Sequence, residues 1–356
     1  MPWPDRRFTD LFNIEHPIVL APMAGSIDHE LAAEVAEAGG LGSIPCAMLD
    51  LEQMHDQVGK YRVRTRRPLN LNFFCHTPPE LNNAREAAWR ERLAPYYREL
   101  GIDPAAPVPS SNRRPFDQAI CDLLLELKPE AASFHFGLPE PALFERVKRA
   151  GILTLSSATT VAEARWLEAR GVDAIIAQGN EAGGHRGIFL GEDIATQPGT
   201  FALVPQVVDA VKVPVIAAGA VTDARGIAAA FMLGAAAVQV GTAFLFCPES
   251  KISAPHRAAL QSARDDGTAL TNLMTGRPAR GLMNRLMREL GPISEAPAFP
   301  LAAGAIAPLR VKAEAAGSGD FTPLWSGQAA ALGVEMPARA LMAKLAGEAQ
   351  ALLRGS

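Results

Sequence analysis

The chain has 356 residues, of which 48% are hydrophobic and 20% are charged, so it is long enough for one large globular domain with insertions. Its formal net charge of -4 gives no electrostatic reason to expect nucleic acid or an anionic membrane surface as a partner. No apolar run approaches the roughly 18 to 20 residues that a membrane span needs, and the first residues lack the apolar region of a signal peptide. We therefore expect a cytoplasmic protein.

Units of one strand followed by one helix repeat along most of the chain, which is the pattern of an α/β fold. Each of the four clearest helical patterns is followed by a glycine, as a helix C-cap requires. Eight such units predict a (β/α)₈ TIM barrel. The predicted strands are 17–21, 42–44, 69–73, 132–135, 152–156, 174–178, 213–217 and 237–240.

Two longer segments interrupt this alternation, an insertion at 76–116 after the third strand and a stretch at 248–327 after the eighth. Both leave from the carboxyl ends of strands, where barrel active sites lie, so we expect them to cover a pocket and exclude water. The alternative is that these segments only add to the protein surface or form an oligomer contact. We divide the chain into a cofactor-binding barrel at 1–247, a substrate-covering segment at 248–327, and closing helices at 328–356.

The ends of the last two predicted strands have the features of a phosphate site. Glycine lets backbone N–H groups approach an anion, and a hydroxyl adds another donor. No G-x-G-x-x-G fingerprint follows an N-terminal strand, so a mononucleotide such as FMN is favoured over a dinucleotide. The residues predicted to bind it here are Ala218, Gly219, Gln239, Val240, Gly241 and Thr242.

His185 is the strongest catalytic candidate. It follows Gly183 and Gly184 in the loop after the sixth strand, where glycines allow the backbone to run close under a flat ligand. An imidazole with an ordinary pKa of ~6.5 can accept or hold a proton near neutral pH. Taken alone, a histidine in a loop could equally be a surface residue.

Side chains after other strands suit a flavin. Asn72 and Gln178 lie at the ends of the third and sixth strands. An amide can both donate and accept hydrogen bonds, which suits the edge of the flavin ring that carries carbonyl and N–H groups. The alternative is that each amide only holds its own loop in place. After the first strand, Pro22, Met23 and Ala24 supply a close backbone and a soft side chain that packs on a ring or in the core.

Two further histidines, His135 and His76, follow the fourth and third strands and either line a substrate pocket or lie in the core. No grouping of histidine and acidic residues has metal-ligand spacing, so no metal site is expected. The four cysteines are scattered and predict buried thiols rather than disulfides.

These motifs together resemble those of the FMN-dependent nitronate monooxygenases, over nearly the whole chain. The segments that carry the resemblance are APMAG at 21–25, GGLGSIP at 39–45, NLNFFCH at 70–76, SFHFGLP at 133–139, QGNEAGGHRG at 178–187 and QVGT at 239–242. They look like the class I branch rather than the related NADH:quinone reductases. The segment 320–328 is similar to the closing segment that returns to the flavin in this family, which places Trp325 at the pocket.

The resemblance implies that FMN is the cofactor and that His185 is catalytic. It implies oxidation of nitronates, such as propionate 3-nitronate, by O₂ to a carbonyl compound and nitrite. His185 would remove the α-proton of a neutral nitroalkane or help to bind a preformed nitronate. A homodimer is possible. The alternatives are an FMN-dependent enoyl-acyl-carrier-protein reductase or an NADH:quinone reductase on the same barrel, and a flavin-binding sensor without activity.

Overall fold

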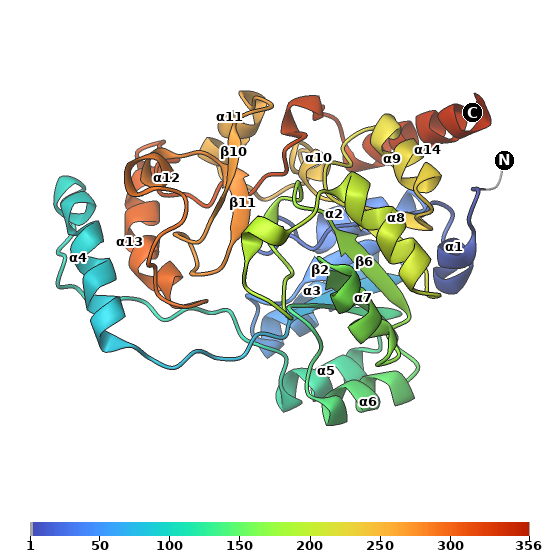
Figure 1. The fold of residues 1–356 in the computed structure, drawn as a ribbon, viewed down its shortest axis with the longest axis horizontal. Coiled ribbons are helices and arrows are strands. Elements are labelled where there is room, and N and C mark those ends of the chain that lie inside the picture. The colour runs from blue at the N-terminus through green and yellow to red at the C-terminus, as the bar shows by residue number, and fades with distance from the viewer. Residues whose placement is uncertain (1–2, 356) are drawn as a thin grey trace.

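The computed structural model describes residues 3–355, and eight parallel strands form its centre. They are hydrogen-bonded in the order β1-β9-β8-β6-β5-β4-β3-β2. The two ends of this series meet where Val19 bridges Leu41, so the sheet closes and the predicted TIM barrel is confirmed (Figure 1). The strands are β1 (Ile18–Leu20), β2 (Gly42–Pro45), β3 (Leu69–Phe74), β4 (Ala131–His135), β5 (Leu153–Ala158), β6 (Ala174–Gln178), β8 (Val215–Ala218) and β9 (Ala237–Val240).

All eight predicted strands are present, with small shifts at their ends. The largest shifts are of two residues: β5 ends two residues later than predicted, and β8 begins two residues later. The backbone N–H of Val213 donates to the Glu168 carboxylate at 3.2 Å rather than to a neighbouring strand. The Glu168 carboxylate therefore takes the place of a backbone carbonyl of a neighbouring strand as the acceptor for Val213.

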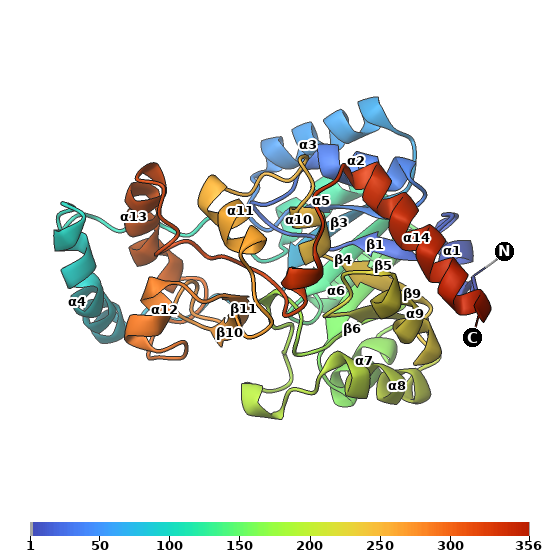
Figure 2. The same cartoon turned by 90° about the horizontal axis from the view of Figure 1, so that it is seen from above.

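Helices surround the barrel because each presents an apolar face to the buried strands. Several begin with a side chain that caps the helix, as Asp28, Thr160 and Asp223 do. The last helix lies across α2 and α9 (Figure 2). These outer helices are α1 (Arg7–Phe12), α2 (His29–Glu37), α3 (Leu51–Arg64), α5 (Gln118–Leu127), α6 (Pro141–Arg149), α7 (Val161–Glu168), α8 (Thr200–Ala210), α9 (Ala224–Met232), α10 (Thr242–Leu245) and α14 (Ala338–Gly355). Short 3₁₀ turns lie at η1 (Ile194–Thr196) and η2 (Ala330–Leu332).

The two interrupting segments meet and form what we call the side lobe, beside the barrel (Figure 1). Trp89 and Leu93 of α4 pack with Leu309 of α13 and with Phe321 in one apolar cluster. The Tyr97 hydroxyl donates to the Ala305 carbonyl at 2.6 Å. The elements of the side lobe are α4 (Asn83–Glu99), α11 (Ala254–Gln261), β10 (Thr268–Thr271), β11 (Ala279–Leu282), α12 (Arg285–Leu290) and α13 (Ala302–Ala315).

The side lobe is joined to the barrel through a second sheet. Its order is β10-β11-β7, and β7 (Gly184–His185) belongs to the loop that follows β6. His185 pairs with Ala279, and Gly184 pairs with Arg280, both antiparallel. The backbone of the histidine loop is therefore fixed by both parts of the molecule.

Candidate active site

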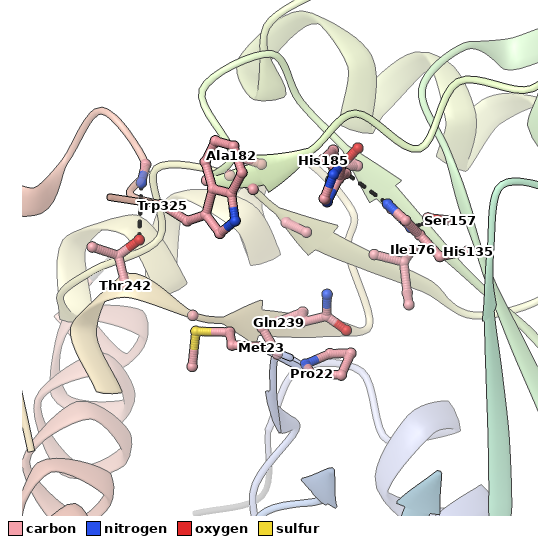
Figure 3. A pocket seen from close by; sticks show the side chains of 18 of the residues that line it. Pro22, Met23, His135, Ser157, Ile176, Ala182, His185, Gln239, Thr242 and Trp325 are labelled. Carbon is pink, nitrogen blue, oxygen red and sulfur yellow. Dashed lines mark hydrogen bonds between the residues drawn. The ribbon is translucent and has the colours of Figure 1, made fainter. Parts of the chain in front are cut away.

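A cavity opens at the carboxyl ends of the barrel strands, between the barrel and the returning segment at 325–329. Figure 3 shows Pro22, Met23 and Gln239 along one side and Trp325, Ala182 and His185 along the other. Two of the predicted site residues, Val240 and His76, do not line it. The predicted residues that do line it are Pro22, Met23, Ala24, Asn72, His135, Gln178, Gly183, Gly184, His185, Ala218, Gly219, Gln239, Gly241, Thr242 and Trp325.

His185 has a fixed ring orientation. Its Nε2 lies 2.9 Å from the hydroxyl oxygen of Thr275, and that oxygen lies 3.5 Å from the Arg277 carbonyl. If the hydroxyl donates to this carbonyl, it accepts from Nε2–H, which leaves Nδ1 as the ring nitrogen with a free lone pair. The rings of Phe299 and Trp325 lie 5.3 Å and 5.6 Å from the imidazole.

The electrostatic surroundings keep His185 neutral. Burial lowers its pKa well below the ordinary value, and the positive charge of Arg113 lowers it further. A neutral imidazole can accept a proton at pH 7, but a lowered pKa makes it a weak base in the ligand-free site. A bound anion would oppose this shift, because it favours the protonated ring.

His135 braces the histidine loop. Its Nε2 lies 3.2 Å from the His185 carbonyl oxygen, which can only accept, so Nε2 carries the proton. Its Nδ1 lies 2.6 Å from the hydroxyl oxygen of Ser157 and accepts from it. Burial lowers the pKa of His135 to about 3. The geometry makes His135 a neutral positioning residue at the edge of the cavity.

The two amides near the carboxyl ends of β3 and β6, Asn72 and Gln178, form hydrogen bonds with other groups of the protein. Gln178 donates from Nε2 to the His185 carbonyl at 2.9 Å and accepts at Oε1 from the Gly187 N–H at 2.7 Å. Asn72 donates to the Ser133 hydroxyl at 3.0 Å. Gln178 thus donates to the same carbonyl as His135 does. Its observed contacts agree with the alternative in which the amide holds its own loop in place.

The other end of the cavity has polar groups that are free to meet a ligand. The Oε1 of Gln239 is buried and has no hydrogen-bond partner within residues 3–355. The Thr242 hydroxyl accepts from the Gly327 N–H at 2.9 Å, so its own proton is available for donation. An unpartnered buried carbonyl oxygen is costly, and this one calls for an N–H donor on the ligand.

His76 lies behind the cavity wall. Its ring packs edge-on against Phe299 at 4.8 Å, and its Nδ1 is buried without a partner in the described chain. Burial lowers its pKa to about 4, so it is neutral near pH 7. These contacts agree with the alternative in which His76 lies in the core rather than in a substrate pocket.

Sequence reasoning missed several residues at the site, among them Ser157, Thr275 and Arg113. Ser157 is the next-to-last residue of β5, at the same carboxyl-terminal face of the barrel as the other candidates, and could have been found from that position alone. Thr275 and Arg113 belong to irregular segments, where no periodicity predicts which side chain faces the barrel.

Searches of residues 3–355 for other kinds of site gave two negative findings. They contain no group of three or more His, Cys, Asp or Glu residues that could hold a metal ion. Over the same residues, no helix is both long and apolar enough to span a membrane. The four cysteines are unpaired, and all but Cys75 are buried.

Comparison with known proteins identifies the family. The model of the family described as nitronate monooxygenase matches residues 5–348. The nitronate monooxygenases of Pseudomonas aeruginosa and Paraburkholderia phytofirmans are 44% and 42% identical to this chain; each alignment covers 96% of this chain, with 98% and 94% of the relatives.

Solved structures agree with this assignment. The nitroalkane oxidase of Streptomyces ansochromogenes superposes with a TM-score of 0.89 at 39% identity, covering 98% of both chains. FabK of Thermotoga maritima superposes with a TM-score of 0.73 at 27% identity, covering 98% of this chain and 97% of its own. The fold, the cavity and these similarities together establish that the chain belongs to the nitronate monooxygenase family of enzymes.

Proposed function

We propose that this protein oxidises alkyl nitronates with O₂ to carbonyl compounds and nitrite, with FMN as its cofactor. The observation that carries the proposal is His185, a neutral imidazole with a fixed ring, on the wall of the cavity opposite Pro22, Met23 and Gln239. This arrangement suits a flat ring between the two walls and a substrate next to the histidine.

The residues present fit a flavin mononucleotide. The unpartnered Gln239 Oε1 suits an N–H of the ring, and the Thr242 hydroxyl near Gly219 suits a phosphate oxygen. No aspartate or glutamate of the described chain lines the cavity, so no carboxylate would repel that phosphate. The bound flavin would supply the oxidation chemistry, as the electron acceptor.

The protein's own contribution is orientation and proton control. With Nε2–H directed at Thr275, Nδ1 of His185 would take the α-proton of a neutral nitroalkane. When the substrate arrives as the nitronate, that step is unnecessary, and the anion instead raises the proton affinity of the ring. Because the pKa of His185 is low before binding, we infer that nitronates are better substrates than neutral nitroalkanes.

The test combines cofactor and activity. Flavin released from the purified holoprotein by denaturation should chromatograph as FMN, and propionate 3-nitronate should yield nitrite with consumption of O₂. Release of FAD would contradict the cofactor. Absence of nitrite from every nitronate tested would contradict the activity.

The reductase alternative has a specific similarity behind it, the 27% identical FabK structure. Rapid anaerobic bleaching of the flavin by NADH, without nitronate turnover, would favour that alternative. A homodimer and a cytoplasmic location stay predictions.

A further inference from the structure

Trp325 is the one aromatic neighbour of His185 that carries a hydrogen-bond donor. Within the described chain, four aromatic rings have their centroids 5.3 to 6.0 Å from the imidazole, those of Phe74, Phe136, Phe299 and Trp325. Three of them are phenylalanines. The indole is therefore the member of this set that can donate to a ligand next to the histidine.

The Nε1–H of Trp325 is free and accessible. No acceptor of residues 3–355 binds it, and the nitrogen is not among the buried unpartnered atoms. Figure 3 shows it on the side of the ring that faces the open space between the two walls of the cavity. In contrast, Nε1 of Trp3 and Nε1 of Trp89 are buried without a partner in the described chain. The Trp325 donor is thus available to a molecule in the cavity.

The main chain at Trp325 is fixed from two sides. Trp325 pairs with Gly281 of β11 in an antiparallel bridge, and the Leu282 N–H donates to the Leu324 carbonyl at 2.8 Å. The Trp325 carbonyl oxygen lies 3.1 Å from Nε2 of His256, a buried histidine of α11, and accepts from it. The fold therefore sets the position of the indole before a ligand binds.

Gly281 leaves room for the indole. A Cβ added there would lie 3.1 Å from Cε3 of Trp325 and 2.8 Å from the Leu324 carbonyl oxygen, so a side chain at this position would displace the ring or its main chain. A donor that is oriented in advance does not have to rearrange when charge develops on the ligand, and donors of this kind contribute strongly to catalysis.

We propose that the Nε1–H of Trp325 donates to an oxygen of the substrate nitro group while His185 removes the α-proton, which makes Trp325 a second catalytic residue. This inference rests on the proposed function and adds a residue to it. In this step the C–H bond breaks, the proton binds Nδ1 of His185, and the electron pair moves through the carbon–nitrogen bond onto the nitro oxygens. The hydrogen bond from Trp325 would strengthen as this negative charge appears.

The arrangement of the two rings suits this division of roles. Base and donor lie on one wall of the cavity, on rings whose centroids are 5.6 Å apart. The α-hydrogen and the nitro oxygens are carried by adjacent atoms of a nitroalkane, so one small group can reach both rings. Phe74 and Phe299 make the surroundings apolar, and a hydrogen bond to a developing charge is stronger where water is excluded.

The first experiment compares neutral nitroethane with preformed ethyl nitronate in Trp325→Phe, which removes the N–H and keeps an aromatic ring. With nitroethane the charge develops during the reaction, so kcat should fall by roughly 10- to 100-fold. With ethyl nitronate the charge is already present in the bound substrate. KM should therefore rise by roughly 10-fold, and kcat should not fall, because an anion that is less stabilised is easier to oxidise.

Trp89→Phe is the matched control. It removes an indole N–H from the apolar cluster that Trp325 packs against, at a position that does not line the cavity, and should leave all four constants within about 2-fold of wild type. Equal falls of kcat on both substrates in Trp325→Phe would overturn the proposal, because they would mean that the indole only supports the site. Unchanged constants would overturn it as well, and would assign the nitro oxygens to another donor, such as Arg113.

A binding measurement separates this proposal from the proposed function. The chain has four tryptophans, so the holoprotein labelled with nitrogen-15 should give four indole N–H resonances, and Trp325→Phe identifies the one from Trp325. Nitrite, an anion with two N–O acceptors, should move that resonance downfield and leave those of Trp3, Trp89 and Trp166 in place. This shift in a protein that oxidised no nitronate would retain the donor and refute the activity. A Trp325 resonance that nitrite does not move would refute the donor.

Discussion

At the scale of single residues, His185 combines a fixed ring orientation with a low proton affinity. Thr275 directs Nε2, and His135 and Gln178 both donate to the backbone carbonyl of the same histidine. The imidazole can therefore turn little, and its Nδ1 is left for the substrate. A base with a lowered pKa removes a proton less readily than an ordinary imidazole does.

We expect His185→Gln to discriminate between the two substrate forms. The glutamine amide can still donate to Thr275 but cannot take a proton, so turnover of neutral nitroethane should fall by ~10²- to 10⁴-fold. With preformed ethyl nitronate the loss should be below about 10-fold. Initial rates of nitrite release give both values. Thr275→Ser, which keeps the hydroxyl, is the control and should resemble wild type; equal losses of the glutamine variant on both forms would show that His185 is a scaffold residue.

The rule that strand ends face the active site predicted where the cavity lies and half of the residues that line it, but not their chemistry. Gln178 was assigned to the flavin by its residue type, whereas both ends of its amide contact the His185 loop. Side-chain direction depends on partners that are distant in the chain, such as Thr275, which is 90 residues from His185. The sequence therefore predicts where polar residues gather, and the fold decides which of them remain free.

At the scale of elements, the loop after β6 is held against the returning segment by a close glycine contact. A Cβ added to Gly183 would lie 2.6 Å from both the Gly327 nitrogen and the Ser326 carbonyl carbon, which are backbone atoms that cannot turn aside. This contact sets the distance between Trp325 and the wall that carries His185. The width of the cavity thus depends on the absence of a side chain at Gly183.

Gly183→Ala should displace the returning segment. We expect a loss of about 1 to 3 kcal/mol in the free energy of unfolding, as for other overpacked sites. Amide hydrogen exchange at 320–330 should become faster, and flavin affinity should fall. Gly59→Ala in α3 is the matched control, because a Cβ there meets nothing within 4 Å and should be neutral or stabilising. Unchanged exchange at 320–330 in Gly183→Ala would mean that the segment is positioned elsewhere.

The strands and helices of the barrel were predictable because each is specified locally, by an apolar run, a cap and a glycine. The side lobe was not. The apolar residues of α4 have no periodic pattern that identifies α13 as their partner, and the pairing of β7 with β11 joins a two-residue strand to one almost 100 residues away. The arrangement of the elements in the side lobe depends on packing between segments that are far apart in the chain.

At the scale of the whole molecule, several buried histidines link stability to pH. Burial lowers the pKa of His76 and His256 to about 4 and that of His135 to about 3. The unfolded chain binds protons at these residues near the ordinary pKa of ~6.5, and the native state does not until much lower pH. Between these values the unfolded state binds more protons, so the native state loses stability as the pH falls.

We therefore expect the free energy of unfolding to fall between about pH 6.5 and pH 5 by ~1.4 kcal/mol per pH unit for each such histidine. Urea unfolding at several pH values in that window measures the slope. His256→Gln should reduce the slope by one histidine's share, since a glutamine amide can keep the bond to the Trp325 carbonyl, 3.1 Å from Nε2. A free energy that is constant from pH 7 to pH 5 would exclude this linkage.

The meeting of α4 and α13 in the side lobe also has a consequence for synthesis on the ribosome. Glu99 ends α4 and Ala302 begins α13, so about 200 residues separate the two partners. At roughly 5 to 20 residues per second, α4 emerges ~10 to 40 s before the helix that covers it. During that interval Trp89 and Leu93 have no native partner on α13, and the nascent chain exposes an apolar face for chaperones to bind.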